Sequence, residues 1–451
     1  MQSPWIHQLK LNREHGHVDQ NLSTDIAIVG AGIAGVSTAY FALKQTTKKI
    51  TLIEGYKVAH GATGHNAGQI VSYFEHPFAD LVKEYGLTMA AKAQEAIYHS
   101  WDLLEEVFAE TKITTPLSVC TGYAGCSSIE QLNLHLRNLK FQREAGLKVE
   151  EVLVANLPEI IENISQEFEG LYAVVEQEYV LKILETNDTR YVGALASKKG
   201  CLNSALFCED VIDFLLTTYP DRFSLYEHSP VEEIKLSPTN AILKINNAEV
   251  TAKRVVLCTN GFENFTITNY EGGEDVNASF HSCVNAKVGY MSAYLEHADH
   301  KPVAISYFSN PGINEETPYY YFTRRRFIHK EKGEENLICI GGPEGDLEHK
   351  GMYHREEHAF PESAKHELDA FIRSSYQYAP HENIDYLFQW HGLMGYTPTG
   401  LRVIGPEPKN PVLMYNLGCN GVGILSSVYG GKRISQFLTY PKLEKSVFDP
   451  R

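Results

Sequence analysis

The chain is poor in positive charge, in cysteine and in uninterrupted hydrophobic sequence. Its 40 lysines and arginines face 56 acidic residues, so the formal net charge is −16. This balance argues against a nucleic-acid partner, because binding a phosphate backbone favours a basic surface. The eight cysteines form no CxxC pair and no metal-ligand spacing. They are therefore predicted to be reduced, packed thiols of a cytoplasmic protein.

Sequence features of membrane insertion and secretion are also lacking. The longest apolar run, 26–43, approaches the length of a membrane span but contains a glycine motif. The first twenty residues carry several charged side chains and no apolar core, so no signal peptide is expected. With 451 residues, 43% of them hydrophobic, the chain can bury a large core, and its length predicts two or three domains.

The clearest positive feature is a glycine motif between a predicted strand at 25–29 and a predicted helix at 36–43. Gly30 permits a tight turn, Gly32 lets backbone amides approach a pyrophosphate, and Gly35 lets the helix lie close to the strand. The free N–H groups at the start of such a helix attract an anion. The motif therefore predicts a dinucleotide-binding site.

A second predicted strand at 50–53 ends in Glu54, which is placed to accept a hydrogen bond from a ribose hydroxyl. Its negative charge would repel the additional phosphate of NADP. A glycine motif alone is weak evidence, but strand, turn, helix, second strand and acid together form the complete fingerprint.

Three further segments carry glycine among small or polar residues: 61–70 (GATGHNAGQI), 390–398 (WHGLMGYTP) and 418–423 (GCNGVG). In this order they resemble the D-amino-acid oxidase-like family of FAD-dependent oxidoreductases, which includes glycine oxidase, sarcosine oxidase and gamma-glutamylputrescine oxidase. The resemblance extends from about residue 22 to the C-terminus and implies FAD, not NAD.

The resemblance implies an α/β protein. A Rossmann-like, glutathione reductase-like FAD-binding domain is expected to be interleaved with an α+β substrate domain on an antiparallel or mixed sheet. The expected FAD-binding parts are 24–90, 191–270 and 386–451, the substrate parts are 91–190 and 271–385, and 1–23 is an N-terminal extension. Within these parts we predict helices at 88–110 and 208–218, strands at 223–226, 241–245 and 254–261, and a hairpin from 318–329 and 336–340.

The fingerprint and the resemblance together predict the cofactor-binding residues. They are Gly30, Gly32, Ile33, Ala34, Gly35, Glu54, Gly61, Ala62, Thr63, His65, Asn66, Ala67, Gly68, Gln69, Val231, Thr259, Asn260, Gly261, Gly392, Gly418, Asn420, Gly421, Val422 and Gly423. The helix predicted after the last glycines would point its N-terminus at the flavin, where reduction gathers negative charge at N1 and the C2 oxygen.

His65 raises the question of covalent attachment. In dimethylglycine dehydrogenase-like members a histidine at the matching place is bonded to the flavin, whereas other members have an arginine there and hold FAD without a bond. The cysteine through which sarcosine oxidase attaches its flavin corresponds to Met394. We therefore expect non-covalent FAD, with His65 as the possible attachment site and otherwise a hydrogen-bonding neighbour.

The resemblance implies oxidation of a C–N bond by hydride transfer to flavin N5, which leaves an imine that water hydrolyses. Residues that bind a small substrate carboxylate in glycine oxidase and sarcosine oxidase correspond here to Gln69, Ser72, Met394 and Leu425. Because a buried unpaired carboxylate is costly, an amine or N-substituted amino compound is the expected substrate.

Tyr396 matches a site tyrosine of the family, and with Arg324 and His65 it completes the expected catalytic residues. The electron acceptor is oxygen or another compound. Oxidation of a small amino acid such as glycine, sarcosine or a D-amino acid stays open as an alternative, as does a non-catalytic flavin-binding subunit.

Three other patterns have competing interpretations. Arg324 or Arg326 could hold an anion, although side chains alternate along a strand and a solvated hairpin tip is equally compatible. The tyrosines 319–321 could line a pocket or only pack within a sheet. Residues 354–358 match the HxxEH pattern of zinc peptidases, but the flavin pattern and the nearby Pro361 favour surface histidines.

Overall fold

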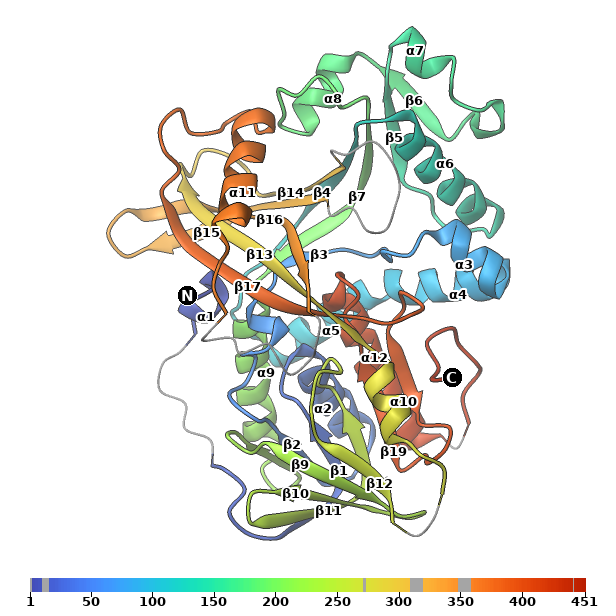
Figure 1. The fold of residues 1–451 in the computed structure, drawn as a ribbon, viewed down its shortest axis with the longest axis vertical. Coiled ribbons are helices and arrows are strands. Elements are labelled where there is room, and N and C mark those ends of the chain that lie inside the picture. Colours follow the sequence, from blue (N-terminus) through green and yellow to red (C-terminus); the bar gives the residue numbers. More distant parts are fainter. Residues whose placement is uncertain (1, 10–15, 271–272, 309–318, 348–357, 441) are drawn as a thin grey trace.

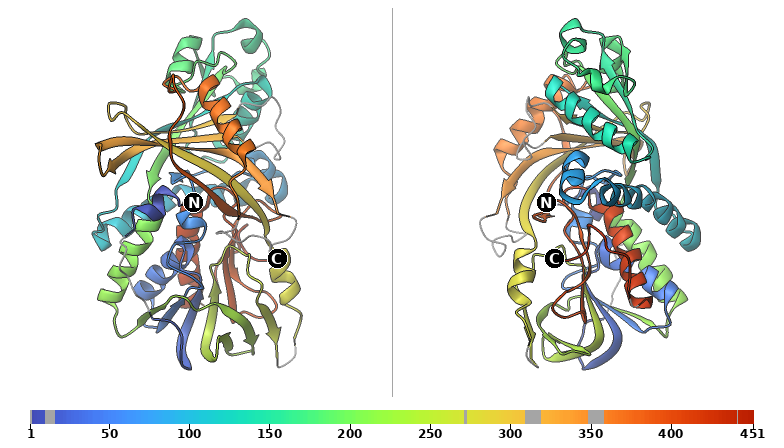
Figure 2. Two further views of the ribbon diagram at one scale, coloured as in Figure 1. Left: turned by 60° about the vertical axis from the view of Figure 1, so that its left-hand side comes forward. Right: turned by 90° about the vertical axis from the view of Figure 1, so that its right-hand side faces the viewer.

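The computed structural model describes residues 2–9, 16–270, 273–308, 319–347, 358–440 and 442–451 (Figure 1). Two large sheets lie one above the other, and several helices occupy the space between them (Figures 1 and 2). Both sheets combine strands from distant parts of the chain, so the interleaved organisation expected from the sequence is confirmed.

The lower sheet has nine strands among the described residues. They are β1 (Leu22–Val29), β2 (Ile50–Ile53), β8 (Phe223–Tyr226), β9 (Val231–Leu236), β10 (Ala241–Ile245), β11 (Ala248–Leu257), β12 (Thr266–Asn269), β18 (Val403–Pro406) and β19 (Leu413–Leu417). The order is β12-β9-β10-β11-β1-β2-β8, with β19 beside β11 and β18 beside β19. The pairs β1–β2, β1–β11, β2–β8 and β11–β19 are parallel. The carboxyl ends of these strands therefore meet along one edge, where ligands bind in open α/β sheets.

Two long helices cover one face of this sheet, namely α2 (Ile33–Gln45) and α12 (Gly423–Thr439). They pack against each other closely, because a Cβ on Gly431 would lie 2.7 Å from the backbone of Thr38. The expected strands at 25–29 and 50–53 and the helix at 36–43 are confirmed.

The upper sheet has ten strands in the described part of the chain. They are β3 (Gln69–Ile70), β4 (Leu117–Cys126), β5 (Glu151–Ala155), β6 (Tyr172–Val175), β7 (Gly193–Leu202), β13 (Asn285–Glu296), β14 (Val303–Phe308), β15 (Tyr320–His329), β16 (Gly333–Asp346) and β17 (Tyr386–Tyr396). The order is β17-β13-β16-β15-β14-β4-β7-β5-β6, with β3 beside β7. The β15–β16 pair confirms the predicted hairpin.

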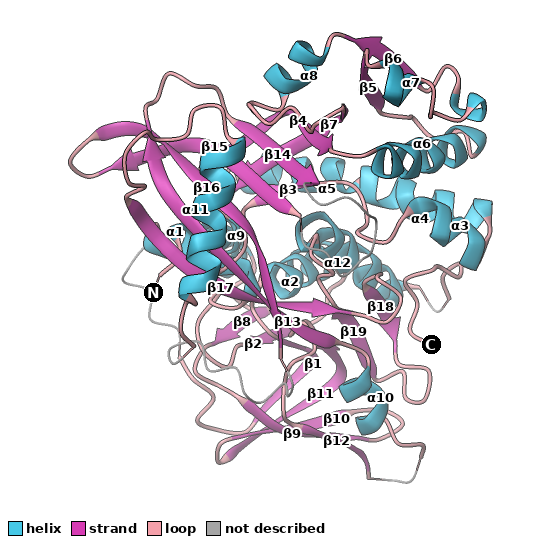
Figure 3. Ribbon diagram, turned by 45° about the horizontal axis from the view of Figure 1, so that its top comes forward, coloured by secondary structure: helices cyan, strands magenta, loops and turns pink. Residues whose placement is uncertain are grey.

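The remaining helices surround these sheets (Figure 3). They are α1 (Pro4–His7), α3 (Phe78–Tyr85), α4 (Leu87–Tyr98), α5 (Ser100–Thr111), α6 (Ile129–Glu144), α7 (Pro158–Ile161), α8 (Gln177–Ile183), α9 (Ser204–Thr218), α10 (Asn277–Ser282) and α11 (Glu362–Ser375), with short 3-10 turns η1 (Ala62–Gly64) and η2 (Gln166–Phe168). The helix predicted at 88–110 is thus two helices, divided at His99.

The expected domain boundaries at 191 and 386 need correction. β7 and β17 pair within the upper sheet, although the sequence placed both in the FAD-binding parts. Conversely, α4 and α5 pack against α12, although residues from 91 onward were assigned to the substrate part. Whether a strand belongs to the upper or the lower sheet depends on pairing between residues far apart in the chain. The local sequence pattern does not encode that pairing.

The N-terminal extension is tied into the fold between the sheets. Trp5 in α1 is fully buried, and its indole N–H donates to the carbonyl oxygen of Asn66. The guanidinium of Arg325 lies 4.4 Å from the centroid of the Trp5 ring and donates to Gln8 Oε1 at 2.9 Å. The extension therefore braces the segment that follows β2.

Candidate functional site

The glycine motif forms the turn between β1 and α2. Gly30 has φ +99°, a conformation that favours glycine, and its N–H donates to the Ile53 carbonyl oxygen at 2.8 Å. A Cβ on Gly35 would lie 1.8 Å from the Gly30 carbonyl oxygen, and one on Gly32 would lie 2.9 Å from Thr63 Oγ1. The helix N-cap is Gly32, which supplies no side-chain cap, so the first turn of α2 presents backbone amides at a cavity.

Glu54 lies at the carboxyl end of β2, beside this turn. Its Oε2 accepts a hydrogen bond from the Ala31 N–H at 2.8 Å, and its Oε1 accepts one from the Tyr56 N–H at 2.9 Å. Glu263, which the sequence analysis did not select, lines the same cavity. Burial raises the pKa of Glu263 to about 7, and the charge of Glu54 contributes in the same direction.

The segment 61–69 closes over the turn. Thr63 Oγ1 accepts from the Ile33 N–H at 3.0 Å, and the Thr63 carbonyl accepts from Ser204 Oγ at 2.6 Å. A Cβ on Gly68 would lie 2.5 Å from the Trp5 ring. Glycine is therefore required at 68, where α1 packs against the segment.

The C-terminal glycines form the approach to α12. Gly418, Asn420 and Gly421 all have positive φ, and Asn420 Oδ1 accepts from the Thr397 N–H at 2.8 Å. α12 has Val422 as its N-cap and no side-chain cap. Its N-terminus, like that of α2, can therefore stabilise negative charge on a ligand.

These segments surround one cavity of about 1190 Å³. That volume exceeds the roughly 300–1,000 Å³ of ordinary small-molecule pockets, which leaves room for a cofactor together with a substrate. The predicted cofactor-binding residues that line it are Gly30, Gly32, Ile33, Ala34, Glu54, Gly61, Ala62, Thr63, His65, Asn66, Ala67, Gly68, Gln69, Val231, Thr259, Asn260, Gly392, Gly421, Val422 and Gly423. Tyr396 lines it as well.

Four other predicted cofactor residues lie behind this lining. Gly35 permits the contact between α2 and the turn. Cβ atoms on Gly261 and Gly418 would meet Val284 and Thr397, and Asn420 holds the backbone of Thr397. These residues shape the cavity wall and do not face the cavity.

His65 lines the cavity with little exposure to solvent. Its Nδ1 is 3.0 Å from the Gly61 carbonyl oxygen, which fixes the orientation of the ring. A Cβ on Gly392 would lie 2.1 Å from the His65 carbonyl oxygen. β17 and the segment 61–69 are therefore in direct backbone contact, and glycine is required at 392.

The upper sheet contributes the side of the cavity opposite the glycine turn. Met394 of β17 faces Lys287 of β13 across the ladder, and a Cβ on Gly289 would lie 2.9 Å from Met394 Cε. Burial raises the pKa of the Tyr396 phenol well above its usual range, so this group stays protonated and can donate a hydrogen bond.

Three carboxylates on this side were missed by the sequence analysis: Glu75, Glu150 and Glu344 all line the cavity. Burial raises the pKa of Glu75 to about 7 and that of Glu150 to about 7, and it also raises the pKa of Glu344. Lys287 lies near Glu344 and is 3.8 Å from Asp346. The carboxylates lie in loops or in a strand with no recognisable spacing, so no local signal marked them.

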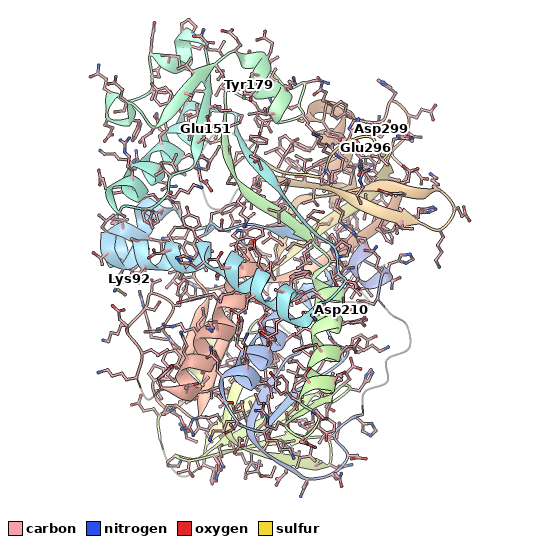
Figure 4. The ribbon with its side chains drawn as sticks, turned by 180° about the vertical axis from the view of Figure 1, so that it is seen from behind. Lys92, Glu151, Tyr179, Asp210, Glu296 and Asp299 are labelled. Carbon is pink, nitrogen blue, oxygen red and sulfur yellow. The ribbon has the colours of Figure 1, made fainter. Side chains whose placement is uncertain are left out.

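Arg324 is not where the sequence analysis expected it. The side chain is 2% exposed and does not line the cavity. Its two terminal nitrogens donate to both oxygens of Glu185 at 2.6 and 2.7 Å, and one of them also donates to Tyr376 Oη at 2.9 Å. Glu296, 3.5 Å from Arg324, is labelled in Figure 4 at the outer end of the upper sheet. The guanidinium therefore serves a buried ion-pair network, which corrects its expected role in holding substrate.

The remaining arginine, tyrosine and histidine patterns occupy different places in the fold. Arg326 is partly exposed on the hairpin and donates to the Ala298 carbonyl oxygen, whereas Tyr319 and Tyr321 line the cavity. Of the HxxEH pattern, residues 354–357 lie outside the described residues, and His358 Nε2 is 2.8 Å from Tyr290 Oη. The described residues contain no group of three histidine, cysteine or acidic side chains arranged to hold a metal ion.

Among the described residues, no helix is both long and apolar enough to cross a bilayer.

Comparison with known proteins places this geometry in a family. The profile of the DAO family, described as "FAD dependent oxidoreductase", matches residues 25–437. The chain therefore belongs to the DAO family of FAD-dependent oxidoreductases, as the sequence motifs indicated.

Two sequence relatives resemble part of the chain. Gamma-glutamylputrescine oxidoreductase of Escherichia coli (strain K12) is 23% identical over 253 residues, 54% of this chain and 51% of that protein. The probable oxidoreductase OrdL of Haemophilus influenzae is 22% identical over 240 residues, 53% of this chain and 49% of that protein. The chain thus spans about half the length of these relatives.

Two solved structures share the fold over nearly the whole chain. Glycine oxidase from Geobacillus kaustophilus has a TM-score of 0.66 at 15% identity and covers 96% of this chain and 99% of its own. L-proline dehydrogenase from P. horikoshii has a TM-score of 0.67 at 15% identity and covers 95% of this chain and 97% of its own. The expected mixed α/β fold is thereby confirmed.

Proposed function

We propose that this protein is an FAD-dependent enzyme that oxidises the C–N bond of an extended, positively charged amine. The observation that carries the proposal is the set of three carboxylates, Glu75, Glu150 and Glu344, on the cavity wall opposite the glycine turn. Burial raises the pKa of all three carboxyls despite their neighbours, and an ammonium group is the ligand complementary to their ionised form.

The residues present fit FAD. The amides at the start of α2 would hold the pyrophosphate, and Glu54 would accept from the ribose. The N-terminus of α12 would face the flavin ring. Side chains larger than glycine at Gly32 would enter the narrow space beside Thr63. Bound FAD supplies the hydride acceptor, and the substrate is left as an imine that water hydrolyses.

The size of the cavity supports an extended substrate. Its lining includes four residues that we call the α6 lining, namely Tyr98 of α4, Gln131 and His135 of α6, and Glu150. Burial lowers the pKa of His135 to about 4, so this imidazole is neutral at physiological pH. The cation that acts on Glu150 is Lys199, and burial nevertheless raises the pKa of Glu150 to about 7. A second ammonium group at the far end of the substrate would be well placed beside Glu150.

Lys287 gives specific support to a second candidate, oxidation of a small amino acid. It lines the cavity, and its ammonium lies 5.7 Å from the centroid of the Tyr396 ring, so it could pair with a substrate carboxylate. The neighbouring Glu344 and Asp346 offset its charge, however, which makes the amine the better match.

A substrate screen with purified holoprotein tests the proposal. Anaerobic flavin reduction is followed by absorbance with mono-, di- and polyamines and their N-acyl derivatives, and with glycine, sarcosine and D-alanine. We expect an extended amine to reduce the flavin fastest. A small amino acid as the best substrate would select the second candidate, and no reduction by any compound would favour a non-catalytic flavin-binding subunit.

The same screen identifies the acceptor. Turnover with the best amine is compared in air-saturated buffer and with a redox dye, which separates an oxidase from a dehydrogenase.

We propose a cytoplasmic location, which the eight free thiols support.

A further inference from the structure

Glu75 lies where several elements of the cavity meet. It follows β3 and precedes α3, and its Oε1 accepts a hydrogen bond from Tyr319 Oη at 2.7 Å. A Cβ on Gly421 would lie 3.3 Å from Glu75 Oε1 and 3.1 Å from Tyr396 Oη. The carboxylate and the Tyr396 phenol therefore approach the same backbone, just before the N-terminus of α12.

The surroundings of Glu75 make it a proton acceptor. Burial raises the pKa of Glu75 to about 7. The hydrogen bond from Tyr319 and the charge of Lys199 oppose this rise, whereas the charge of Glu344 adds to it. The ionisable groups facing Glu75 are the phenols of Tyr73, Tyr319, Tyr321 and Tyr396, the Glu344 carboxylate and the Lys199 ammonium. Burial raises the pKa of all four phenols, so they remain protonated and can donate a hydrogen bond but not take up a proton.

The other carboxylates of the cavity are less suited to this task. Glu344 is near Lys287, whose charge lowers the pKa of the Glu344 carboxyl against the effect of burial. Burial raises the pKa of Glu150 to about 7, as it does for Glu75, so geometry and not pKa separates these two carboxyls. Glu75 is the one whose oxygen approaches the backbone before α12, the part of the cavity assigned to the flavin.

We infer that Glu75 accepts the proton of the substrate ammonium and so delivers the amine in its neutral form. This inference rests on the proposed function. An N–H bond of the ammonium breaks and an O–H bond forms at Glu75 Oε2, while the electron pair of the N–H bond stays on nitrogen as its lone pair. No electrons are transferred in this step, and two opposite charges are neutralised. The nitrogen lone pair is then available to form the C=N bond when hydride leaves the neighbouring carbon.

The first test is the pH dependence of anaerobic flavin reduction by the best amine of the screen. In the wild-type protein the limiting reduction rate should be constant above about pH 7.5 and fall as pH drops through the pKa of Glu75, about 7. In Glu75→Gln the rate should be about 10³-fold lower at pH 7.5, because only about that fraction of a free alkylammonium is neutral there. It should then rise about tenfold per pH unit toward the pKa of a free alkylammonium, near 10.4.

Glu344→Gln is the matched carboxylate variant. It should change the concentration of amine needed for half-saturation. Because the Glu344 charge raises the pKa of Glu75, the decline in rate should also move to lower pH, without the steep rise toward high pH expected of Glu75→Gln. A steep rise with pH in Glu344→Gln, or identical profiles in wild type and Glu75→Gln, would overturn the assignment to Glu75.

A second test measures binding without turnover. tert-Butylamine has no hydrogen on the carbon next to nitrogen, so it can perturb the flavin absorbance without reducing it. Its Kd should be nearly constant from pH 8 to pH 10 in wild type and should weaken about tenfold per unit of falling pH in Glu75→Gln. If no amine in the screen reduces the flavin, the proposed function fails, and this titration still decides whether Glu75 takes the proton.

Tyr319→Phe keeps the inference testable if Glu75→Gln does not fold. Removing the hydrogen bond to Oε1 withdraws an interaction that lowers the pKa of Glu75. The pH at which wild-type reduction declines should therefore move upward in this variant. An unchanged or lower midpoint would contradict the role of Glu75.

Discussion

The two sheets form opposite sides of the same cavity by different chemical means. The lower sheet contributes mainly backbone, through the turn after β1 and the N-termini of α2 and α12. The upper sheet and the loops beside it contribute side chains, including Tyr396, Glu75 and Lys287. A site built from backbone groups requires small residues that let the chain approach the ligand, whereas a site built from side chains can change its ligand through substitutions. We therefore expect the lower sheet to bind the cofactor common to the family and the upper sheet to bind a substrate particular to this chain.

The largest expected effect is on the backbone side. Gly32→Val should abolish FAD binding, because a branched side chain would lie beside Thr63 Oγ1, where a Cβ alone comes within 2.9 Å, and would block the pyrophosphate. The measurement is the flavin-to-protein absorbance ratio after purification and after incubation with FAD. Gly16→Ala is the control, since a Cβ there meets nothing within 4 Å. A folded Gly32→Val protein, as judged by circular dichroism, that binds FAD normally would refute the assignment.

That prediction relies on the part of the structure that the sequence predicted well. β1, the turn, α2 and β2 are consecutive, and each residue type has a local mechanical reason. The upper sheet could not be predicted from consecutive elements in this way, because β7 and β17 pair with strands from distant parts of the chain. Glu75 and Glu150 were missed for the same reason: only the folded chain brings isolated loop carboxylates to the cavity.

Arg324 shows that the upper sheet also contains charged side chains whose role is purely structural. Arg324→Ala should lower the free energy of unfolding by about 3–5 kcal/mol, because Glu185 and Glu296 would lose their buried cation. The half-saturating amine concentration should stay unchanged in the folded protein. Urea unfolding and steady-state kinetics are the two measurements.

The control is Arg326→Ala, two residues further along the same strand, where the side chain is 43% exposed. Its unfolding free energy should change by less than about 0.5 kcal/mol. An Arg324→Ala protein of normal stability but strongly weakened substrate binding would restore the original expectation that this arginine holds the substrate.

Glu150 tests whether the α6 lining binds the far end of the substrate. Glu150→Gln should raise KM for a diamine about tenfold or more at pH 8, because a charge-assisted hydrogen bond contributes about 1.5–3 kcal/mol. KM for a monoamine of similar size should change less, and FAD content should not change. The adjacent Glu151, labelled in Figure 4, is exposed, and Glu151→Gln is the matched control. Equal changes in KM for monoamine and diamine would show that Glu150 does not bind the far end of the substrate.

The smallest expected effect concerns His65, where the two halves touch. Its Nδ1 is oriented by the Gly61 carbonyl oxygen, and its backbone contacts Gly392 of β17. A covalent link would require a ring nitrogen within bonding distance of the flavin 8α-methyl group, a stricter demand than packing beside the ring.

We therefore expect acid denaturation to release all flavin into the supernatant. His65→Ala should weaken FAD binding only several-fold, and His60→Ala, a histidine outside the cavity lining, should leave it unchanged. Flavin fluorescence that stays with the polypeptide on a denaturing gel, and is lost in His65→Ala, would instead identify His65 as the attachment site. The side of the cavity that contributes mainly backbone groups would then hold FAD through a covalent bond to a side chain.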